Sequence, residues 1–305
     1  MLRILFIRSR KAFLPEINAY MKYFSKRNEF EAFDSFDLQN DYEIDDFDII
    51  WEFKGFGGMN NTDKVLVHEY ASLSTGYFPR LKNRLKLIFN PKPHLRVFLN
   101  ETVRHEFGFK DDVDYCYRDM GIDESFLHLR TTGKEYDFVY VGSVSKSREI
   151  DILLREYTKC SPGKLCLIGN VDDEIYSTYK RNKDIIFTGP VPYSEVPLIA
   201  SKATYGINYV PNKYPFNIQT STKLLEYLAL GLKVITTDYS WVREFEKKHG
   251  CNFYKLDHHN ISFDMNKIEK HNFVSDFKPE DYLWDNIIER AGIAERVLDI
   301  CQHVY

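Results

Sequence analysis

The chain has 305 residues, of which 44% are hydrophobic and 28% charged, and its formal net charge is −4. This composition is that of a folded globular protein, excludes extensive disorder and argues against a nucleic-acid-binding protein as a whole. The five cysteines lack C-x-x-C spacing, so neither a disulfide framework nor a zinc site is expected, and a reducing compartment fits best. No apolar run approaches the roughly 20 residues that span a bilayer.

The first half of the chain alternates strand-like and helical patterns. An apolar run at residues 3–7 is too short for a signal peptide and predicts a first β-strand. A helix is predicted over residues 15–24, where Pro15 suits the first turn. Further strands are predicted at residues 47–53, 64–68, 95–99 and 113–117. This alternation favours a largely parallel α/β sheet.

A second series of the same kind begins at residue 136. Its predicted strands are residues 138–141, 164–168, 185–188, 205–209, 234–237 and 253–256, and its predicted helices are residues 147–157, 173–180, 196–200 and 221–230. The polar segment 130–135 is the predicted linker. We therefore expect an α/β protein with two Rossmann-like domains, residues 1–132 and 133–281, followed by an amphipathic helix over residues 282–305.

Residues 215–238, PFNIQTSTKLLEYLALGLKVITTD, read as loop, helix, tight turn and buried strand. The hydroxyls of Thr220, Ser221 and Thr222 are candidate caps for the helix start. Gly231 suits the left-handed position at the helix end. A helix that begins in such a loop directs backbone amides and the positive end of its dipole at a phosphate.

Glu226 lies about one and a half turns into this helix, where its carboxylate could accept hydrogen bonds from sugar hydroxyls beside that phosphate. These features together describe a cradle for a nucleotide sugar. A capped helix that carries a surface pair of Lys223 and Glu226 is the alternative interpretation.

The same stretch resembles the nucleotide-binding segment of retaining GT-B glycosyltransferases, particularly family four, in which a helix reading S-x-K-x-x-E-Y-x-x-x-G precedes a V-I strand. The residues in these places are Ser221, Lys223, Glu226, Tyr227, Gly231, Val234 and Ile235. The family motif often has a second glutamate eight positions before the first, and Ile218 stands there. The resemblance then implies that the donor sugar is contacted from elsewhere, with Asn217 and Gln219 as candidates.

The segment YVGSVSKSR, residues 140–148, brings a glycine and positive charge to the end of a predicted strand. Backbone at Gly142 can approach a phosphate closely, and Lys146 and Arg148 are cationic. The family form of this segment is V-G-R followed by a lysine, and these two side chains grip the diphosphate. Here Ser143 stands in place of the arginine. The resemblance implies that Lys146 is the lysine that binds the diphosphate and that Arg148 supplies the positive charge that Ser143 lacks. A solvated basic loop is the alternative.

Residues 185–211 resemble the F-x-G-x-V segment of the family, in which backbone beside the glycine meets the nucleobase. By this resemblance Gly189, Pro190 and Val191 border the base. The dipeptide Gly189-Pro190 is also a good turn, and the two interpretations are compatible.

In the first half, His68 ends the strand predicted at residues 64–68, and open α/β sheets bind ligands at the carboxyl ends of their strands. The resemblance implies a histidine near the donor sugar, so His68 and Glu69 are catalytic candidates together with Lys146 and Glu226. A purely structural histidine is the alternative. The GFGG segment, residues 55–58, is either a loop near the ligand or a plain turn.

Residues 77–96 concentrate basic and apolar side chains in one segment. A basic amphipathic helix of this kind can lie on an anionic membrane surface, and an ordinary surface helix has a similar pattern. If the membrane interpretation holds, a lipid-linked acceptor suits it.

The resemblance implies a metal-independent, retaining hexosyltransferase with the GT-B fold and a donor site between two domains. It assigns the acceptor to residues 1–132 and the nucleotide sugar to residues 133–281, and it implies that the helix over residues 282–305 packs back on the first domain. No metal is expected, because Lys146, Arg148 and Lys223 could stabilise the charge of the leaving diphosphate. The substrates are a nucleotide sugar, with a UDP-sugar favoured over a GDP-sugar, and a glycan or lipid-linked glycan of a bacterial surface polysaccharide such as O-antigen, capsule or lipopolysaccharide. No cofactor and no nucleic acid is expected, and the predicted location is the cytoplasm or the cytoplasmic face of the inner membrane.

Two alternatives stay open. One keeps the fold and changes the reaction to that of a nucleotide-sugar epimerase or an inverting transferase. The other is a catalytically silent GT-B protein that binds a nucleotide sugar or a glycan, because Ile218 and Ser143 depart from the family pattern.

Overall fold

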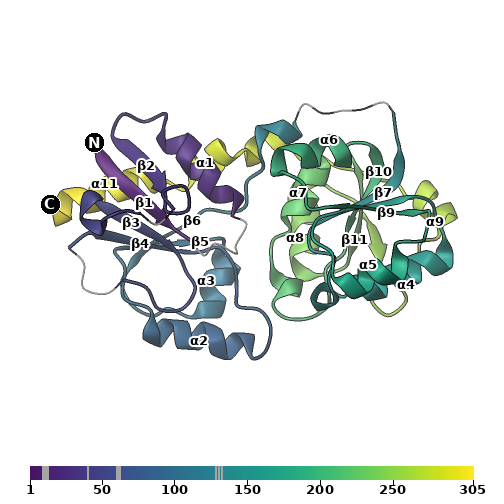
Figure 1. The fold of residues 1–305 in the computed structure, drawn as a ribbon, viewed down its shortest axis with the longest axis horizontal. Coiled ribbons are helices and arrows are strands. Elements are labelled where there is room, and N and C mark those ends of the chain that lie inside the picture. The colour runs from purple at the N-terminus through teal and green to yellow at the C-terminus, as the bar shows by residue number, and fades with distance from the viewer. Residues whose placement is uncertain (9–13, 40, 60–62, 128, 130, 132) are drawn as a thin grey trace. The chain divides into compact units, whose positions relative to one another are not determined.

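A computed structural model describes residues 1–8, 14–39, 41–59, 63–127, 129, 131 and 133–305. The chain forms two compact units, Met1–Gly121 together with Asp281–Tyr305, and Ile122–Glu280. The second unit is therefore an insertion in the sequence of the first (Figure 1). The division precedes the boundary expected near residue 132, because buried Ile122 and Phe126 already belong to the second unit. Residues 130 and 132 of the expected linker lie outside the described residues.

The first unit contains a parallel six-stranded sheet with the order β2-β1-β3-β4-β5-β6. Its strands are β1 (Leu2–Ile7), β2 (Phe30–Asp34), β3 (Ile49–Phe53), β4 (Val65–Tyr70), β5 (Leu95–Phe98) and β6 (Asp114–Tyr117). Its helices in this part of the chain are α1 (Pro15–Phe24), α2 (Pro79–Phe89) and α3 (Glu101–Phe107). The sequence analysis does not predict β2. This strand forms one edge of the sheet, and its sequence FEAFD lacks the apolar run of the central strands.

The segment after the second unit returns to the first unit as two helices, α10 (Trp284–Arg290) and α11 (Ile293–Val304). The single helix expected over residues 282–305 is wrong, because Gly292 adopts a left-handed φ of 61° and separates the two. Arg27, which follows α1, is within 2.7 Å of Glu289 and 3.0 Å of Glu295. Arg296 pairs with Asp114 of β6 at 2.7 Å. These ion pairs join the last two helices to elements near the start and the middle of the chain.

The second unit contains another parallel six-stranded sheet with the order β12-β11-β10-β7-β8-β9. Its strands are β7 (Tyr136–Val141), β8 (Leu165–Ile168), β9 (Ile185–Gly189), β10 (Ala203–Asn208), β11 (Lys233–Thr237) and β12 (Tyr254–Leu256). Its helices are α4 (Ile150–Cys160), α5 (Asp173–Tyr179), α6 (Val196–Ala200), α7 (Thr222–Ala229), α8 (Ser240–His249) and α9 (Met265–Lys270). The strand order reverses between β7 and β10, and such a reversal is where doubly wound sheets bind ligands.

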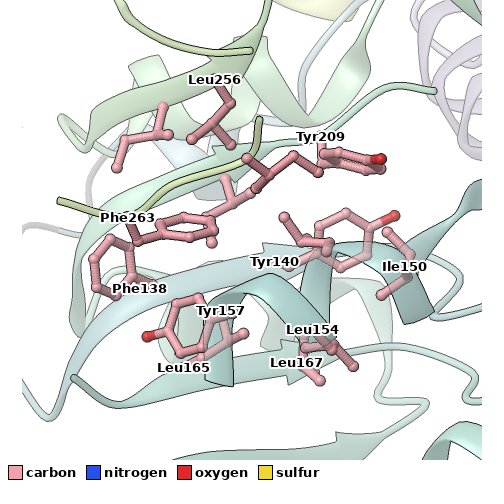
Figure 2. Packing of buried hydrophobic residues seen from close by; sticks show 14 of the residues in the cluster. Phe138, Tyr140, Ile150, Leu154, Tyr157, Leu165, Leu167, Tyr209, Leu256 and Phe263 are labelled. Carbon is pink, nitrogen blue, oxygen red and sulfur yellow. The ribbon is translucent and has the colours of Figure 1, made fainter. Parts of the chain in front are cut away.

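The core of the second unit contains a cluster of buried aromatic and aliphatic side chains between its sheet and neighbouring helices (Figure 2). The rings of Tyr157 and Phe263 lie 4.9 Å apart and both contact Phe138 of β7, at 5.5 and 5.8 Å. Edge-to-face contacts of this kind stabilise a core beyond the simple burial of area. They fix α4 and the segment near Phe263 against one face of the sheet.

Within the described parts of the chain, no helix is both long enough and apolar enough to cross a membrane.

Candidate functional site

Two glycines hold the loops that follow β7 and β8 against each other. Gly142 has a φ of +132° and Gly169 a φ of +135°, values that L side chains rarely adopt. A Cβ atom on Gly169 would lie 2.3 Å from the carbonyl oxygen of Gly142, which no real side chain could do without displacing backbone. The amide of Gly142 donates to the carbonyl of Ile168 at 2.9 Å. The loop after β7 is therefore fixed where the strand order reverses.

Tyr227 of α7 joins the two strands on either side of this reversal. Its hydroxyl accepts a hydrogen bond from the amide of Val141 at 2.8 Å and donates to the carbonyl of Ile207 at 3.4 Å. The ring packs on Gly206 of β10, where a Cβ atom would lie only 2.4 Å from it. Tyr227 is fully buried. The helix is thereby positioned over the carboxyl ends of β7 and β10.

The N-terminus of α7 differs from the prediction in one respect. Ser221 is the residue before the helix, but its side chain makes no capping bond and donates instead to Oδ1 of Asn208 at 2.7 Å. The prediction that the Ser221 hydroxyl caps the helix is wrong, because Asn208 at the end of β10 offers a buried acceptor. The first turn of α7 keeps backbone amides that an anion could use.

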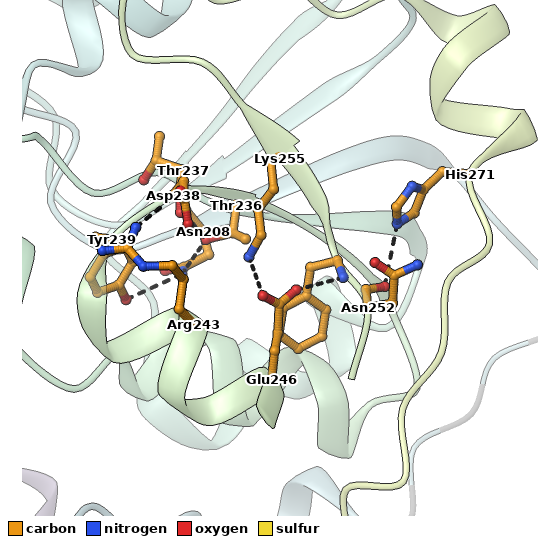
Figure 3. A network of polar contacts seen from close by, with 11 residues as sticks. Asn208, Thr236, Thr237, Asp238, Tyr239, Arg243, Glu246, Asn252, Lys255 and His271 are labelled. Carbon is orange, nitrogen blue, oxygen red and sulfur yellow. Dashed lines mark hydrogen bonds and ion pairs between the residues drawn. The ribbon is translucent and has the colours of Figure 1, made fainter. Parts of the chain in front are cut away.

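Asn208 belongs to a buried polar network that sequence reasoning missed (Figure 3). Its Nδ2 donates to Oγ1 of Thr236 at 2.9 Å and reaches the hydroxyl of Tyr239 at 3.5 Å. Thr237 accepts from the amide of Val210 at 3.0 Å. The network ties the loop before α7 to β11. The polar pair Thr236-Thr237 at the end of an apolar strand was the sequence signal for it.

Lys223 and Glu226 occupy the part of α7 that adjoins the loop after β7. Lys223 Nζ lies 4.9 Å from the ring centroid of Tyr140, and its Cε would be 3.8 Å from a Cβ on Gly142. Burial and the neighbouring Arg148 lower the pKa of Lys223 to about 7, against the opposing effect of Glu226. The ammonium group of Lys223 therefore lies beside Gly142, where water solvates it poorly.

Glu226 is 4% exposed, and its Oε1 accepts a hydrogen bond of 2.7 Å from the hydroxyl of Tyr193. Burial raises the pKa of Glu226 to about 7, while the Tyr193 hydrogen bond and the Lys223 charge act in the opposite direction. The alternative of a solvated surface carboxylate is thereby excluded. Perturbed carboxylates of this kind are concentrated at functional sites.

The structure separates the two cationic candidates of the loop after β7. Lys146 pairs with Glu174 of α5 at 2.5 Å, and its amide donates to Asp172 at 2.8 Å. Arg148 instead lies over the ring of Phe216 at 5.2 Å and is near enough to Lys223 to lower its pKa. Arg148, rather than Lys146, is the cation that shares its surroundings with Lys223.

The remaining candidates lie on the loops around these side chains. Asn217 is in the short helical turn Phe216–Ile218, and its carbonyl accepts from Ser240 at 3.2 Å. Gln219 Nε2 is shielded from solvent and has no hydrogen-bond partner among the described residues. Thr220 and Thr222 are half-buried at the helix start, and Ser143 is exposed beside Gly142. Gly189, with a φ of +70°, is the last residue of β9. Exposed Pro190 and half-buried Val191 follow it.

In the first unit, the prediction that His68 ends a strand is wrong. β4 continues through Glu69 and Tyr70, and His68 is completely buried within it. The strand continues because Glu69 pairs with β3 and β5 and Tyr70 pairs with β5. The carboxylate of Glu69 has buried partners, Arg118 at 2.7 Å and the indole of Trp51 at 2.9 Å. Alternate residues of a strand face opposite sides of the sheet, so His68 and Glu69 do not share a site.

His68 faces a compact group of titratable side chains. Its Nε2 is 3.2 Å from Oε2 of Glu52, which is also 3.2 Å from Nζ of Lys54. Burial lowers the pKa of His68 to about 4, although Glu52 opposes this. Gly58, with a φ of +128°, packs directly over this group, where a Cβ atom would lie 2.2 Å from Nζ of Lys54. The GFGG segment, residues 55–58, thus packs on the side chains of Glu52 and Lys54.

Across the described residues, no group of three or more His, Cys, Asp or Glu side chains is arranged to hold a metal ion.

Residues 135–262 match the sequence model of the family glycosyl transferases group 1. The matched residues all lie within the second unit. No curated protein matches the sequence of the chain.

Solved structures are similar to the whole chain. HepE from Anabaena, in complex with UDP and glucose, has 14% identity and a TM-score of 0.62. AviGT4, a glycosyltransferase involved in avilamycin A biosynthesis, has 12% identity and a TM-score of 0.60. The UDP-N-acetylglucosamine 2-epimerase of Rickettsia bellii has 12% identity and a TM-score of 0.55. Each likeness covers 100% of this chain and 98% of the other chain, and the chain therefore has their fold, which is GT-B.

Proposed function

We propose that this protein transfers a hexose from a nucleoside-diphosphate sugar to an acceptor hydroxyl. The observation that carries this proposal is that α7 places half-buried Lys223 beside Gly142 and buried Glu226 one turn further along, in a unit that matches the glycosyl transferases group 1 model. The amides of α7, Lys223 and Arg148 would bind the diphosphate, and Glu226 would accept hydrogen bonds from the ribose hydroxyls. The loop around Gly189 would border the base.

The proposed reaction breaks the bond between C1 of the sugar and the β-phosphate oxygen and forms a bond from C1 to the acceptor oxygen. The acceptor proton goes to the departing diphosphate, whose charge Arg148, Lys223 and the α7 amides stabilise as it develops. We propose retention of the anomeric configuration and an acceptor on a bacterial surface glycan. Retention is tested by the anomeric configuration of the product, and inversion would contradict it.

A UDP-sugar is the first candidate donor and a GDP-sugar the second, because HepE, which is similar to this chain, was crystallised with UDP. A thermal-shift screen against UDP, GDP, ADP, CMP and their sugars tests this, since a ligand of the native state raises its melting temperature. One of the nucleotides should raise the melting temperature selectively, and the variant Glu226→Ala should abolish this increase. The control Glu269→Ala removes an exposed carboxylate of α9 and should leave it unchanged. The proposal fails if no nucleotide shifts the melting temperature of the wild-type protein.

A nucleotide-sugar epimerase is the second candidate, favoured by the similarity of the whole chain to the UDP-N-acetylglucosamine 2-epimerase of Rickettsia bellii. Incubation with the donor alone distinguishes the two reactions. Nuclear magnetic resonance spectra that show a new configuration within an intact nucleotide sugar, with no acceptor present, would establish the epimerase. A donor that stays unchanged until an acceptor is added would establish the transferase.

A further inference from the structure

Helix α2 exposes the side that a surface helix normally buries. Its apolar residues Leu81, Leu85 and Ile88 recur at the spacing i, i+4, i+7, which places them on one face. Leu81 is 53% exposed and Ile88 is 73% exposed. The buried residue of the helix is the polar Asn83, whose side chain accepts from the amide of Ser74 at 3.0 Å. α2 therefore buries a polar residue, while Leu81 and Ile88 of the apolar stripe face outward.

Neighbouring residues extend this stripe into a patch. Tyr77 and Phe78, just before the helix, are 88% and 75% exposed, and Phe78 has a left-handed φ of 51°. Phe89 ends the helix at 59% exposure and contacts the ring of Phe56, which is itself 56% exposed, at 5.8 Å. We call Phe56, Tyr77, Phe78, Leu81, Ile88 and Phe89 the apolar patch. Contiguous exposed side chains of this size mark an interaction surface.

The charges around the apolar patch have one sign. Residues 77–96 contain six lysines and arginines and no aspartate or glutamate, in a chain with a net charge of −4. Lys92 and Arg96 are paired with Asp112 and Asp111. The other four cations belong to α2, where exposed Arg84 and Lys82 flank the apolar stripe on its two sides, and Lys82 also donates to the carbonyl of Thr75 at 3.0 Å. An apolar stripe flanked by exposed cations complements the acyl chains and the phosphates of an anionic lipid surface.

We propose that the apolar patch inserts into the interface of an anionic bilayer, with α2 lying in the membrane plane. A second copy of the chain suits this surface less well, since a symmetric contact would place cations against cations. A single-stranded nucleic acid would use the aromatic rings, but Leu81 and Ile88 offer no base-stacking face. The proposal does not depend on the nucleotide site of the second unit, and it adds a location to the proposed transfer reaction.

The test is flotation of the full-length protein with vesicles of phosphatidylcholine alone or with about one third phosphatidylglycerol. We expect binding to the anionic vesicles that weakens with salt. The double variant Leu81→Ser/Ile88→Ser should lose about tenfold or more of the binding, and Arg84→Ser should lose a smaller part. Leu198→Ser, which removes a side chain 49% exposed in α6, is the matched control and should bind like the wild type.

Three outcomes would overturn the proposal. They are equal binding by the wild type and the double variant, no binding of the wild type to either vesicle, and capture of a labelled single-stranded oligonucleotide in place of vesicles. Near-ultraviolet circular dichroism of the double variant checks that it is folded. Glu226→Ala should still float with anionic vesicles, so that failure of the nucleotide site and failure of the membrane surface are told apart.

Discussion

The hydroxyl of Tyr193 donates a hydrogen bond of 2.7 Å to Oε1 of Glu226, linking two residues that lie 33 positions apart in the chain. This contact orients the carboxylate that we propose binds the ribose. It also opposes the effect of burial, which raises the pKa of Glu226 to about 7. Tyr193 in turn packs against Phe126 with ring centroids 5.5 Å apart, so the carboxylate is held by a supported side chain.

Tyr193→Phe should therefore weaken nucleotide binding in a pH-dependent manner. Without its donor, Glu226 has a still higher pKa and is less ionised at pH 7, so calorimetry at pH 7 should show affinity lower by about threefold to tenfold. At pH 8.5 the carboxylate is ionised in both proteins and the difference should narrow. Tyr176→Phe changes an exposed tyrosine of α5 and serves as control. Equal affinities of wild type and Tyr193→Phe at pH 7 would contradict the assignment.

Lys223 should take up a proton when a nucleoside diphosphate binds. Its pKa is lowered to about 7, so most of the side chain is neutral at pH 8, and a nearby diphosphate raises the pKa again because it favours the charged form. The uptake should approach about one proton per nucleotide and is measured by calorimetry in two buffers with different ionisation enthalpies.

The variant Lys223→Met should abolish this uptake, whereas Lys233→Met, at an exposed position of β11, should retain it. An undiminished uptake in Lys223→Met would show that another group binds the proton.

The two cations of the loop after β7 should differ in their effect on binding. Arg148→Ala should weaken the affinity for a nucleoside diphosphate by about tenfold or more, since it removes a cation near Lys223. Lys146→Ala removes a cation that is already paired with Glu174 and should change the affinity by less than about threefold. Calorimetric titrations with UDP compare the variants. The reverse order would restore the role that the family resemblance gives to Lys146.

The buried network around Asn208 should contribute to the stability of the second unit. Asn208→Ala removes the acceptor of the Ser221 hydroxyl and the donor to Oγ1 of Thr236, and it should lower the free energy of unfolding by about 1–3 kcal/mol. Urea unfolding followed by circular dichroism measures this, with Asn266→Ala, an exposed position in α9, as the control. A loss of stability no larger than that of the control would mean that water replaces the missing bonds.

The spacing of apolar residues predicted the helices and strands whose pattern is visible within a short stretch of sequence. Helix α1 has the bounds expected, since Pro15 fixes its first turn and its apolar residues follow helical spacing. The strands of the second unit were predicted because each is a short buried run between polar segments. Strand β2 and helix α8 were not predicted, because charged residues interrupt their apolar pattern. Tertiary packing decides that β2 forms an edge of its sheet and that α8 packs on the surface of its unit.

At the candidate site, sequence reasoning found the residues of one contiguous helix and missed their distant partners. Glu226 and Lys223 were found because both lie in one motif. Tyr193 was missed because its role depends on a contact 33 positions away. Glu69 was misjudged for the same reason, since Arg118, which neutralises it inside the first unit, lies well beyond it in the chain. Pairings of this kind are properties of the folded chain that no local pattern carries.

The insertion of the second unit into the first has a consequence for biosynthesis. Trp284 of α10 lies 5.2 Å from the buried guanidinium of Arg118, and its ring occupies the space that a Cβ on Gly121 would need. Translation delivers Trp284 only after the whole of Ile122–Glu280 has left the ribosome. The second unit, which is continuous, can fold as it emerges, while the first must wait with its Arg118 side uncovered. We therefore expect the second unit to complete its fold before the first.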